Sequence, residues 1–213
     1  SSGAGIFTAQ FHGSRDTEGV RHTFRFKLLV ASIITVGGML LFGFAGKNLI
    51  GAYIAADTAP ADAAATLGYA WQYLCIMLVG LVPFALTQCY AGTLRESGQT
   101  VMPMKASMIA MVVNFVFNAL LIFGLFGFPR MGVAGAAVAT VLSRFVELAV
   151  VVVGAHRSLE RYPFFEGVYA SMHIPAELAK NILLRSMPLL LNELMWGMGQ
   201  AILLQCYSVR GIQ

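Results

Sequence analysis

Five long apolar segments constrain what this chain of 213 residues can fold into. They are residues 28–46, 67–94, 106–129, 131–155 and 186–209. The first three contain no charged side chain, the fourth contains only Arg144 and Glu147, and the fifth contains only Glu193. A helix of about 20 apolar residues crosses a hydrocarbon core of about 30 Å. The sequence therefore predicts an all-α, polytopic transmembrane helix bundle with five full spans.

The chain has too few charged residues to form a soluble surface. Charged residues make up 11% of the sequence and hydrophobic residues 58%, whereas an average soluble domain has roughly 25% charged residues. A soluble globular domain is therefore excluded. Residues 1–11 are also apolar but too few to cross a bilayer, so we expect them to be a helix stub whose beginning is missing.

Lys and Arg residues alternate between the two sides of the predicted spans. Ten lie on one side, namely Arg15, Arg21, Arg25, Lys27, Arg95, Lys105, Arg157, Arg161, Lys180 and Arg185. The other side has Lys47, Arg130 and Arg210. Because Lys and Arg concentrate in cytoplasmic loops, the first side is predicted to face the cytoplasm. These residues form no patch with interleaved aromatic residues, so we expect no nucleic-acid partner.

The most polar loop is residues 156–181, which contains Pro163 and Pro175. It is longer than the other connections on the predicted cytoplasmic side. We interpret it as a cytoplasmic linker between two groups of helices, and residues 175–185 as the start of the next helix, with Pro175 in the first turn.

Polar residues within the spans need a partner or a purpose, because a charge in hydrocarbon costs at least roughly 2.5–3.5 kcal/mol. Arg144 and Glu147 are three residues apart on one helix face, so they form either a structural ion pair or part of a site that handles ions or substrate. Asn114 and Asn118 are four residues apart. They are predicted either to join two helices by hydrogen bonds or to line a binding site.

Glu193 has no basic residue within a turn or two along its own helix. At about 100° per residue, Asn192, Glu193, Trp196 and Gln200 fall within one arc of roughly 100°. A polar face of this kind points away from lipid, where its carboxylate can hold a proton and release it when a cation or water arrives. The alternative is a glutamate that holds two helices together.

Four stretches resemble the multidrug and toxic compound extrusion (MATE) family of transporters. They are GAGIFTAQFHGSRD at 3–16, PFALTQCYAGTLRESGQTVMPM at 83–104, NFVFNALLIFGLFGFPRMGVAGAAVATVLSRFVE at 114–147 and MPLLLNELMWGMG at 187–199. The resemblance covers nearly the whole chain. It implies twelve helices in two six-helix bundles that face a central cleft, with this chain as a fragment from the end of helix two to helix seven.

On that register, residues 1–155 form most of the N-terminal bundle, residues 156–181 the cytoplasmic linker and residues 182–213 the first helix of the C-terminal bundle. The resemblance also implies a Na⁺- or H⁺-coupled antiporter that exports organic cations or drugs. Glu193, Asn192, Gln200 and Trp196 would bind the cation or the substrate, with Asn114 and Asn118 matching the asparagines of helix five. Some members have an Asp in helix six, where this sequence has Ala136, Thr140, Arg144 and Glu147 instead.

The family resemblance also sets the expected partners. They are a small cationic substrate and membrane lipid, with no cofactor beyond the coupling ion, and the full-length protein is expected to be a monomer in a bacterial inner membrane. The spans lack HExxH, GxSxG and paired Asp residues, so neither catalytic residues nor a metal site is expected. A related flippase of lipid-linked oligosaccharides and a non-transporting structural subunit stay open as alternatives.

Overall fold

The computed structural model describes residues 2–52, 60–127, 129–171 and 173–210. Its helices are α1 (Ser2–Gly13), α2 (Thr17–Gly51), α3 (Pro60–Glu96), α4 (Val101–Phe123), α5 (Val133–Arg157) and α6 (Ala176–Arg210), with short 3₁₀ turns η1 (Leu125–Gly127) and η2 (Pro163–Phe165). The described residues outside these helices form turns and irregular links, which confirms the predicted all-α class. Residues 1, 53–59, 128, 172 and 211–213, which fall within predicted segments, lie outside the described residues.

Four of the described helices, α2 to α5, are long and apolar enough to cross a membrane. They coincide with the first four predicted spans. The fifth predicted span, 186–209, is helical as part of α6, and its mean hydropathy is lower than that of α2 to α5. Asn192, Glu193 and Gln200 lower the hydropathy of this helix.

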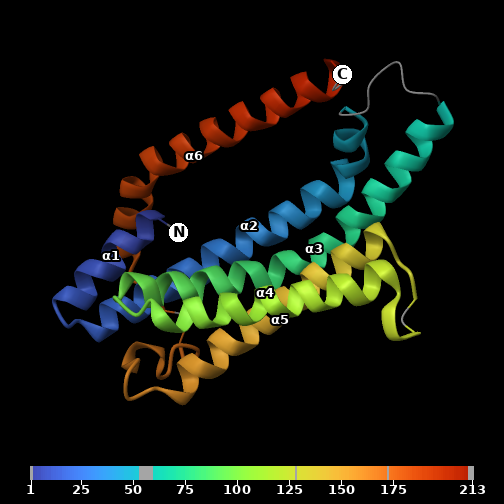
Figure 1. Cartoon of the computed structure of the whole chain (residues 1–213). Helices are drawn as coiled ribbons and strands as arrows, with labels where there is room; N and C mark the ends of the chain where they lie inside the picture. Colours follow the sequence, from blue (N-terminus) through green and yellow to red (C-terminus); the bar gives the residue numbers. More distant parts are fainter. Residues whose placement is uncertain (1, 53–59, 128, 172, 211–213) are drawn as a thin grey trace.

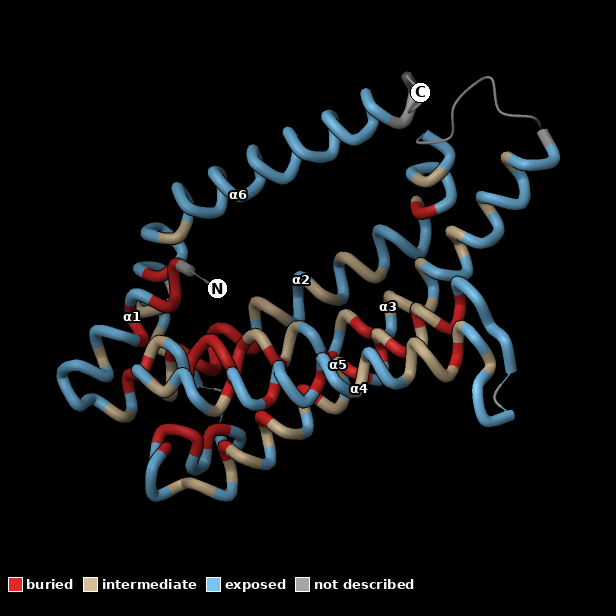
Figure 2. Tube along the Cα trace, viewed as in Figure 1, coloured by how far each residue is buried: buried red, intermediate tan, exposed pale blue. Residues whose placement is uncertain are grey.

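Helices α2 to α5 lie side by side, and α6 stands apart from them (Figure 1). Helix α5 packs along both α3 and α4. Near its start α6 contacts α1, and near its end the Gln205 amide donates a hydrogen bond to the Ala52 carbonyl over 3.5 Å. Buried residues gather at the end of the bundle where α1 lies, whereas most of α6 is exposed (Figure 2).

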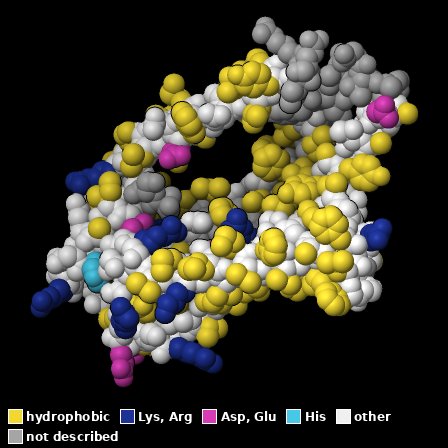
Figure 3. Space-filling view, viewed as in Figure 1, with side chains coloured by type: hydrophobic (Ala, Val, Ile, Leu, Met, Phe, Trp, Pro, Cys, Tyr) yellow, Lys and Arg dark blue, Asp and Glu magenta, His cyan; other side chains and the backbone are white. Residues whose placement is uncertain are grey.

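Most Lys and Arg side chains gather at that same end of the molecule, which we call the basic end (Figure 3). It contains α1, the start of α2, the end of α3 and the 156–181 segment. Helix α2 begins there because the Asp16 carboxylate accepts a hydrogen bond from the Gly19 amide over 2.9 Å, which caps the helix.

The core at the basic end is aromatic. Phe24 on α2, Tyr90 on α3 and Phe165 on η2 pack together with ring centroids 4.9–5.1 Å apart. Tyr162, Phe164 and Val168 are buried beside them. The first part of the segment predicted as a cytoplasmic linker is therefore built into the core of the bundle.

The sequence predicted that Arg25 and Lys27 precede the first span. In the structure both are inside α2 and buried, and each has polar partners on another element that offset the burial of its charge. Arg25 donates to the carbonyls of Val168 and Gly167, over 2.8 and 3.1 Å. Lys27 pairs with Glu96 and donates to the Thr93 hydroxyl over 3.1 Å.

Candidate functional site

Helices α4 and α5 form an antiparallel pair that brings polar residues of both helices together. Gly124, in the left-handed conformation, ends α4 and lets the chain reverse. At Gly135 the helices are so close that an added Cβ atom would lie 2.8 Å from the Leu121 carbonyl oxygen. Ala134, Ala137 and Ala139 are also buried. These small residues let the backbones of α4 and α5 approach closely, which favours helix association in a membrane.

Asn114 is the centre of the hydrogen bonds between these two helices. Its Nδ2 donates to the hydroxyls of Thr140 and Ser143 over 3.4 and 3.5 Å, and its Oδ1 accepts from Asn118 Nδ2 over 2.9 Å. Thr140 and Ser143 in turn donate to the carbonyls of Ala136 and Thr140. The structure thus brings the predicted residues Asn114 and Asn118 together and adds two hydroxyls to them.

A second polar group lies two helical turns along the same pair. Ser107 on α4 donates to Glu147 Oε1 over 2.7 Å, and Arg144 Nη1 donates to Glu147 Oε2 over 3.0 Å. The Arg144 guanidinium lies 5.1 Å from the centroid of the Phe84 ring on α3, at cation–π distance. The Glu147 side chain is only 9% exposed, so its two hydrogen bonds and its ion pair offset its burial.

Together these residues form a polar seam along the apolar α4–α5 pair, consisting of Ser107, Asn114, Asn118, Thr140, Ser143, Arg144 and Glu147. Ser107 and Asn114 are seven residues apart, as are Thr140 and Glu147, so each pair repeats after about two turns on one helix face. The sequence reasoning missed Ser107. The sequence feature that indicates Ser107 is its spacing of seven residues from Asn114, which places both on one helix face.

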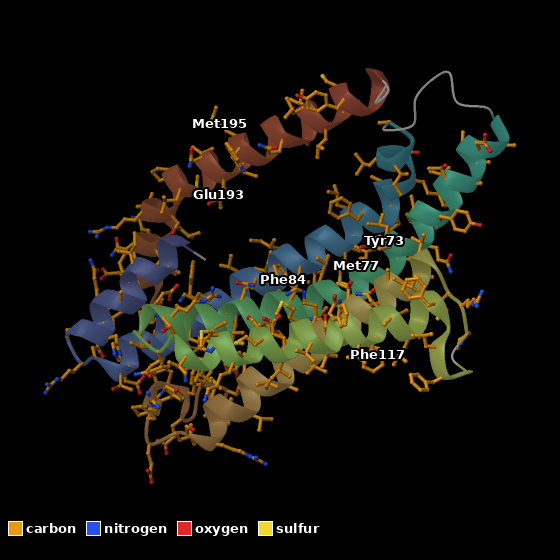
Figure 4. The ribbon with its side chains drawn as sticks, in the orientation of Figure 1. Tyr73, Met77, Phe84, Phe117, Glu193 and Met195 are labelled. Carbon is orange, nitrogen blue, oxygen red and sulfur yellow. The ribbon has the colours of Figure 1, made fainter. Side chains whose placement is uncertain are left out.

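The other predicted site residues lie on α6, away from the polar seam. Asn192, Glu193, Trp196 and Gln200 are all exposed, Trp196 by 69%. Figure 4 shows Glu193 on the side of α6 that faces α2, and Met195 on the opposite side. Between α6 and α2 the space-filling view shows an opening that the described side chains do not fill (Figure 3).

The described part of the chain contains no group of three or more His, Cys, Asp or Glu residues placed to hold a metal ion. The polar seam offers one carboxylate and one guanidinium group together with amides and hydroxyls. Such a set can bind and orient a polar ligand, and its single carboxylate already has two partners.

Comparison with known proteins identifies the family. The sequence model of the MatE family matches residues 1–120, which is more than half of the chain. The chain belongs to the MatE family. This confirms the resemblance seen in the sequence, and the match includes α1, α2, α3 and Asn114 and Asn118 on α4.

Several relatives carry the names of transporters or of probable multidrug resistance proteins. A probable multidrug resistance protein NorM of Thermotoga maritima is 44% identical over 75 residues, which cover 35% of this chain and 16% of that protein. The uncharacterized transporter YisQ of Bacillus subtilis is 24% identical over 215 residues, which cover 100% of this chain and 45% of that protein. The chain thus spans less than half the length of either relative.

A solved structure shares the fold. It is an inward-facing conformation of a multidrug resistance MATE family transporter of the MOP superfamily, matched with a TM-score of 0.68 at 22% identity. The match covers 87% of this chain and 39% of the solved chain. With four helices apolar enough to span a bilayer, this MatE chain is part of a multi-pass integral membrane protein.

Proposed function

We propose that the full-length protein is a cation-coupled antiporter that exports amphipathic organic cations through a bacterial inner membrane. Membership in the MatE family supports this proposal, as do relatives that are named as probable multidrug resistance proteins. The coupling ion would be Na⁺ or H⁺. The observation that carries the proposal is Glu193, an acid on a mostly apolar helix, which lies on the side of α6 that faces α2 (Figure 4) and the opening between these helices (Figure 3).

In this mechanism Glu193 binds the coupling cation or proton in one orientation of the transporter. An organic cation then replaces it in the other orientation, because one carboxylate cannot neutralise both. Competition for a single charge couples the two fluxes. Asn192 and Gln200 would complete the polar face, and Trp196 would stack on an aromatic cation, since indole faces attract cations.

The test is Glu193→Gln in the full-length protein, reconstituted in liposomes with an imposed Na⁺ or pH gradient. The carboxamide keeps the shape of the side chain but cannot take up a proton or neutralise a cation. We expect gradient-driven efflux of a cationic dye to fall to the level of empty liposomes.

The matched control is Glu177→Gln, which removes the acid in the first turn of α6. It should leave dye efflux unchanged. Equal efflux by Glu193→Gln and wild-type protein would contradict the role of Glu193 and leave it a structural residue. Glu193→Asp, which keeps the charge, should recover part of the efflux.

A further inference from the structure

A pocket of about 520 Å³ lies among α3, α4 and α5, at the end of the polar seam that contains Ser107, Arg144 and Glu147. Arg95, Arg144 and Glu147 supply its charged groups, and Thr87 and Gln88 are among its uncharged polar groups. Its volume is within the usual range for small-molecule sites. With two guanidinium groups and one carboxylate, the pocket has a net positive charge.

The hydrogen bonds already made in this pocket leave donors rather than acceptors free. Both oxygens of Glu147 accept bonds, one from Ser107 and one from Arg144. Arg144 uses Nη1 for that bond, so Nε and Nη2 have no hydrogen-bond partner in the described part of the chain. Arg95 donates from Nε to the Ala91 carbonyl and only over 3.5 Å from Nη2 to Gln88. The free donors of the two guanidinium groups therefore favour a ligand that brings acceptors.

Thr87 gives an independent indication of a ligand. Its side chain lines the pocket and is only 1% exposed. Its hydroxyl nevertheless has no hydrogen-bond partner among the described residues. A buried polar group without a partner costs about 1–3 kcal/mol, so such groups are rare unless a further molecule satisfies them.

Apolar side chains complete the wall of the pocket. Phe84 holds the Arg144 guanidinium over its ring yet remains 39% exposed, and Met104 lies on the α4 side. The charged and apolar parts of the wall together suit an amphipathic molecule with an acidic group. Arg95 lies in the last turn of α3 at the basic end, which the predicted topology places on the cytoplasmic side.

We propose that this pocket binds the carboxylate or phosphate group of an amphipathic compound, with Arg144, Arg95 and Thr87 as donors. The proposal rests on the proposed function for one of two sources of that group, a transported compound that carries an acid besides its cation. The other source is the headgroup of an anionic phospholipid from the cytoplasmic leaflet. Guanidinium groups bind both chemistries through charge-assisted hydrogen bonds.

The test uses the full-length protein in detergent without an ion gradient, and two rhodamine dyes that differ in one group. One dye has a free benzoate, and the other is its methyl ester. Fluorescence polarisation measures the binding of each. We expect Arg144→Gln to weaken binding of the free acid by about 10-fold or more, because a charge-assisted bond is lost, and to change binding of the ester less than about 2-fold.

Thr87→Val keeps the test decisive if Arg144→Gln fails to fold, because valine has nearly the shape of threonine. It should weaken binding of the free acid and raise the melting temperature of the ligand-free protein, since the unpaired hydroxyl is gone. The matched control, Arg157→Gln at the exposed end of α5, should leave the binding of both dyes unchanged. A change that is the same for both dyes in Arg144→Gln or Thr87→Val, or no change in either, would overturn the proposal.

Nanodiscs distinguish the two sources of the acidic group. If phosphatidylglycerol added to phosphatidylcholine nanodiscs displaces the free-acid dye, the site takes a lipid headgroup; if the dye stays bound, the site takes a transported compound. Glu193→Gln separates this proposal from the proposed function. It should abolish coupled efflux and retain binding of the free acid, so each proposal can fail without the other.

Discussion

Lys27 on α2 and Glu96 on α3 form an ion pair at the basic end of the bundle, where the Lys27 side chain is only 3% exposed and the Glu96 side chain 20%. Thr93 accepts a further hydrogen bond from Lys27. The pair joins two helices that also contribute apolar side chains to the core at this end, among them Phe24, Leu28 and Leu94. Lys27 is the more buried partner. The charged form of Lys27 therefore depends more on the countercharge of Glu96 than the charged form of Glu96 depends on Lys27.

Removing either partner of this pair should destabilise the protein, and removing Glu96 should cost more. Glu96→Leu leaves a buried ammonium group without a countercharge, a change that typically costs about 3–5 kcal/mol. Lys27→Met leaves a carboxylate that water can still reach. Melting in detergent should therefore rank wild type above Lys27→Met and Lys27→Met above Glu96→Leu.

The double variant Lys27→Met/Glu96→Leu provides the control for that ranking. It removes both charges, so its melting temperature should exceed that of Glu96→Leu. A double variant that melts below both single variants would show that apolar packing lost around the pair, and not the unpaired charge, causes the destabilisation.

Arg25 should hold the 162–168 segment against the bundle. Its guanidinium is buried and donates to two carbonyls of that segment, Val168 and Gly167. Arg25→Ala removes both bonds and leaves the carbonyls unpaired, so the segment should open more often. Hydrogen exchange measured by mass spectrometry should show faster exchange at 162–171.

Lys180→Ala, at an exposed site near the start of α6, is the control for Arg25→Ala and should leave exchange at 162–171 unchanged. Unchanged exchange in Arg25→Ala would mean that the buried aromatic residues alone fix the segment. Phe164 and Phe165 would then be the residues to substitute next.

The sequence predicted the helices well because uncharged apolar runs long enough to cross a bilayer leave the backbone few alternatives. It misplaced the start of α2. Arg25 and Lys27 interrupt the apolar run, yet Thr17–Gly51 is one helix because both charges find partners on α3 and on the 162–168 segment. Those partners are 69 and 143 residues away in sequence, so no local pattern indicates them.

The site was predictable where its residues share one helix. Asn114 and Asn118 are four residues apart, and their hydrogen bond follows from that spacing. The bond from Ser107 to Glu147 needs the register between two antiparallel helices, which close approach at Gly135 sets. The roles of Asn192, Glu193, Trp196 and Gln200 stay predictions, because a helical arc shows which side chains share a face and not what covers that face.

Gly135 should tolerate no larger residue. The Cβ of an alanine would lie 2.8 Å from a backbone oxygen, that of Leu121, which cannot move without separating α4 from α5. Gly135→Ala should therefore lower the melting temperature and weaken the hydrogen bonds of Asn114. Circular dichroism at increasing temperature measures the first effect.

Gly154→Ala on the same helix is the matched control. Its Cβ would meet the flexible end of Met102, which can rotate away. Gly43→Ala on α2, with no atom within 4 Å, should raise stability slightly because alanine favours helix by about 1 kcal/mol. If Gly135→Ala melts at the same temperature as Gly154→Ala, α4 and α5 can move apart enough to accommodate the added methyl group without loss of stability.

Alanine variants of Asn114 and Asn118 should distinguish a structural role of these asparagines from a binding role. Asn114 joins Thr140, Ser143 and Asn118, so Asn114→Ala should lower stability by about 1–2 kcal/mol and also reduce efflux. Asn118 bonds only Asn114 within the described chain. Asn118→Ala should therefore change the melting temperature less, while dye efflux per folded molecule falls at least as much. Asn181→Ala, at an exposed asparagine of α6, controls for loss of an amide and should change neither quantity. Full efflux in Asn118→Ala would assign both asparagines to helix packing alone.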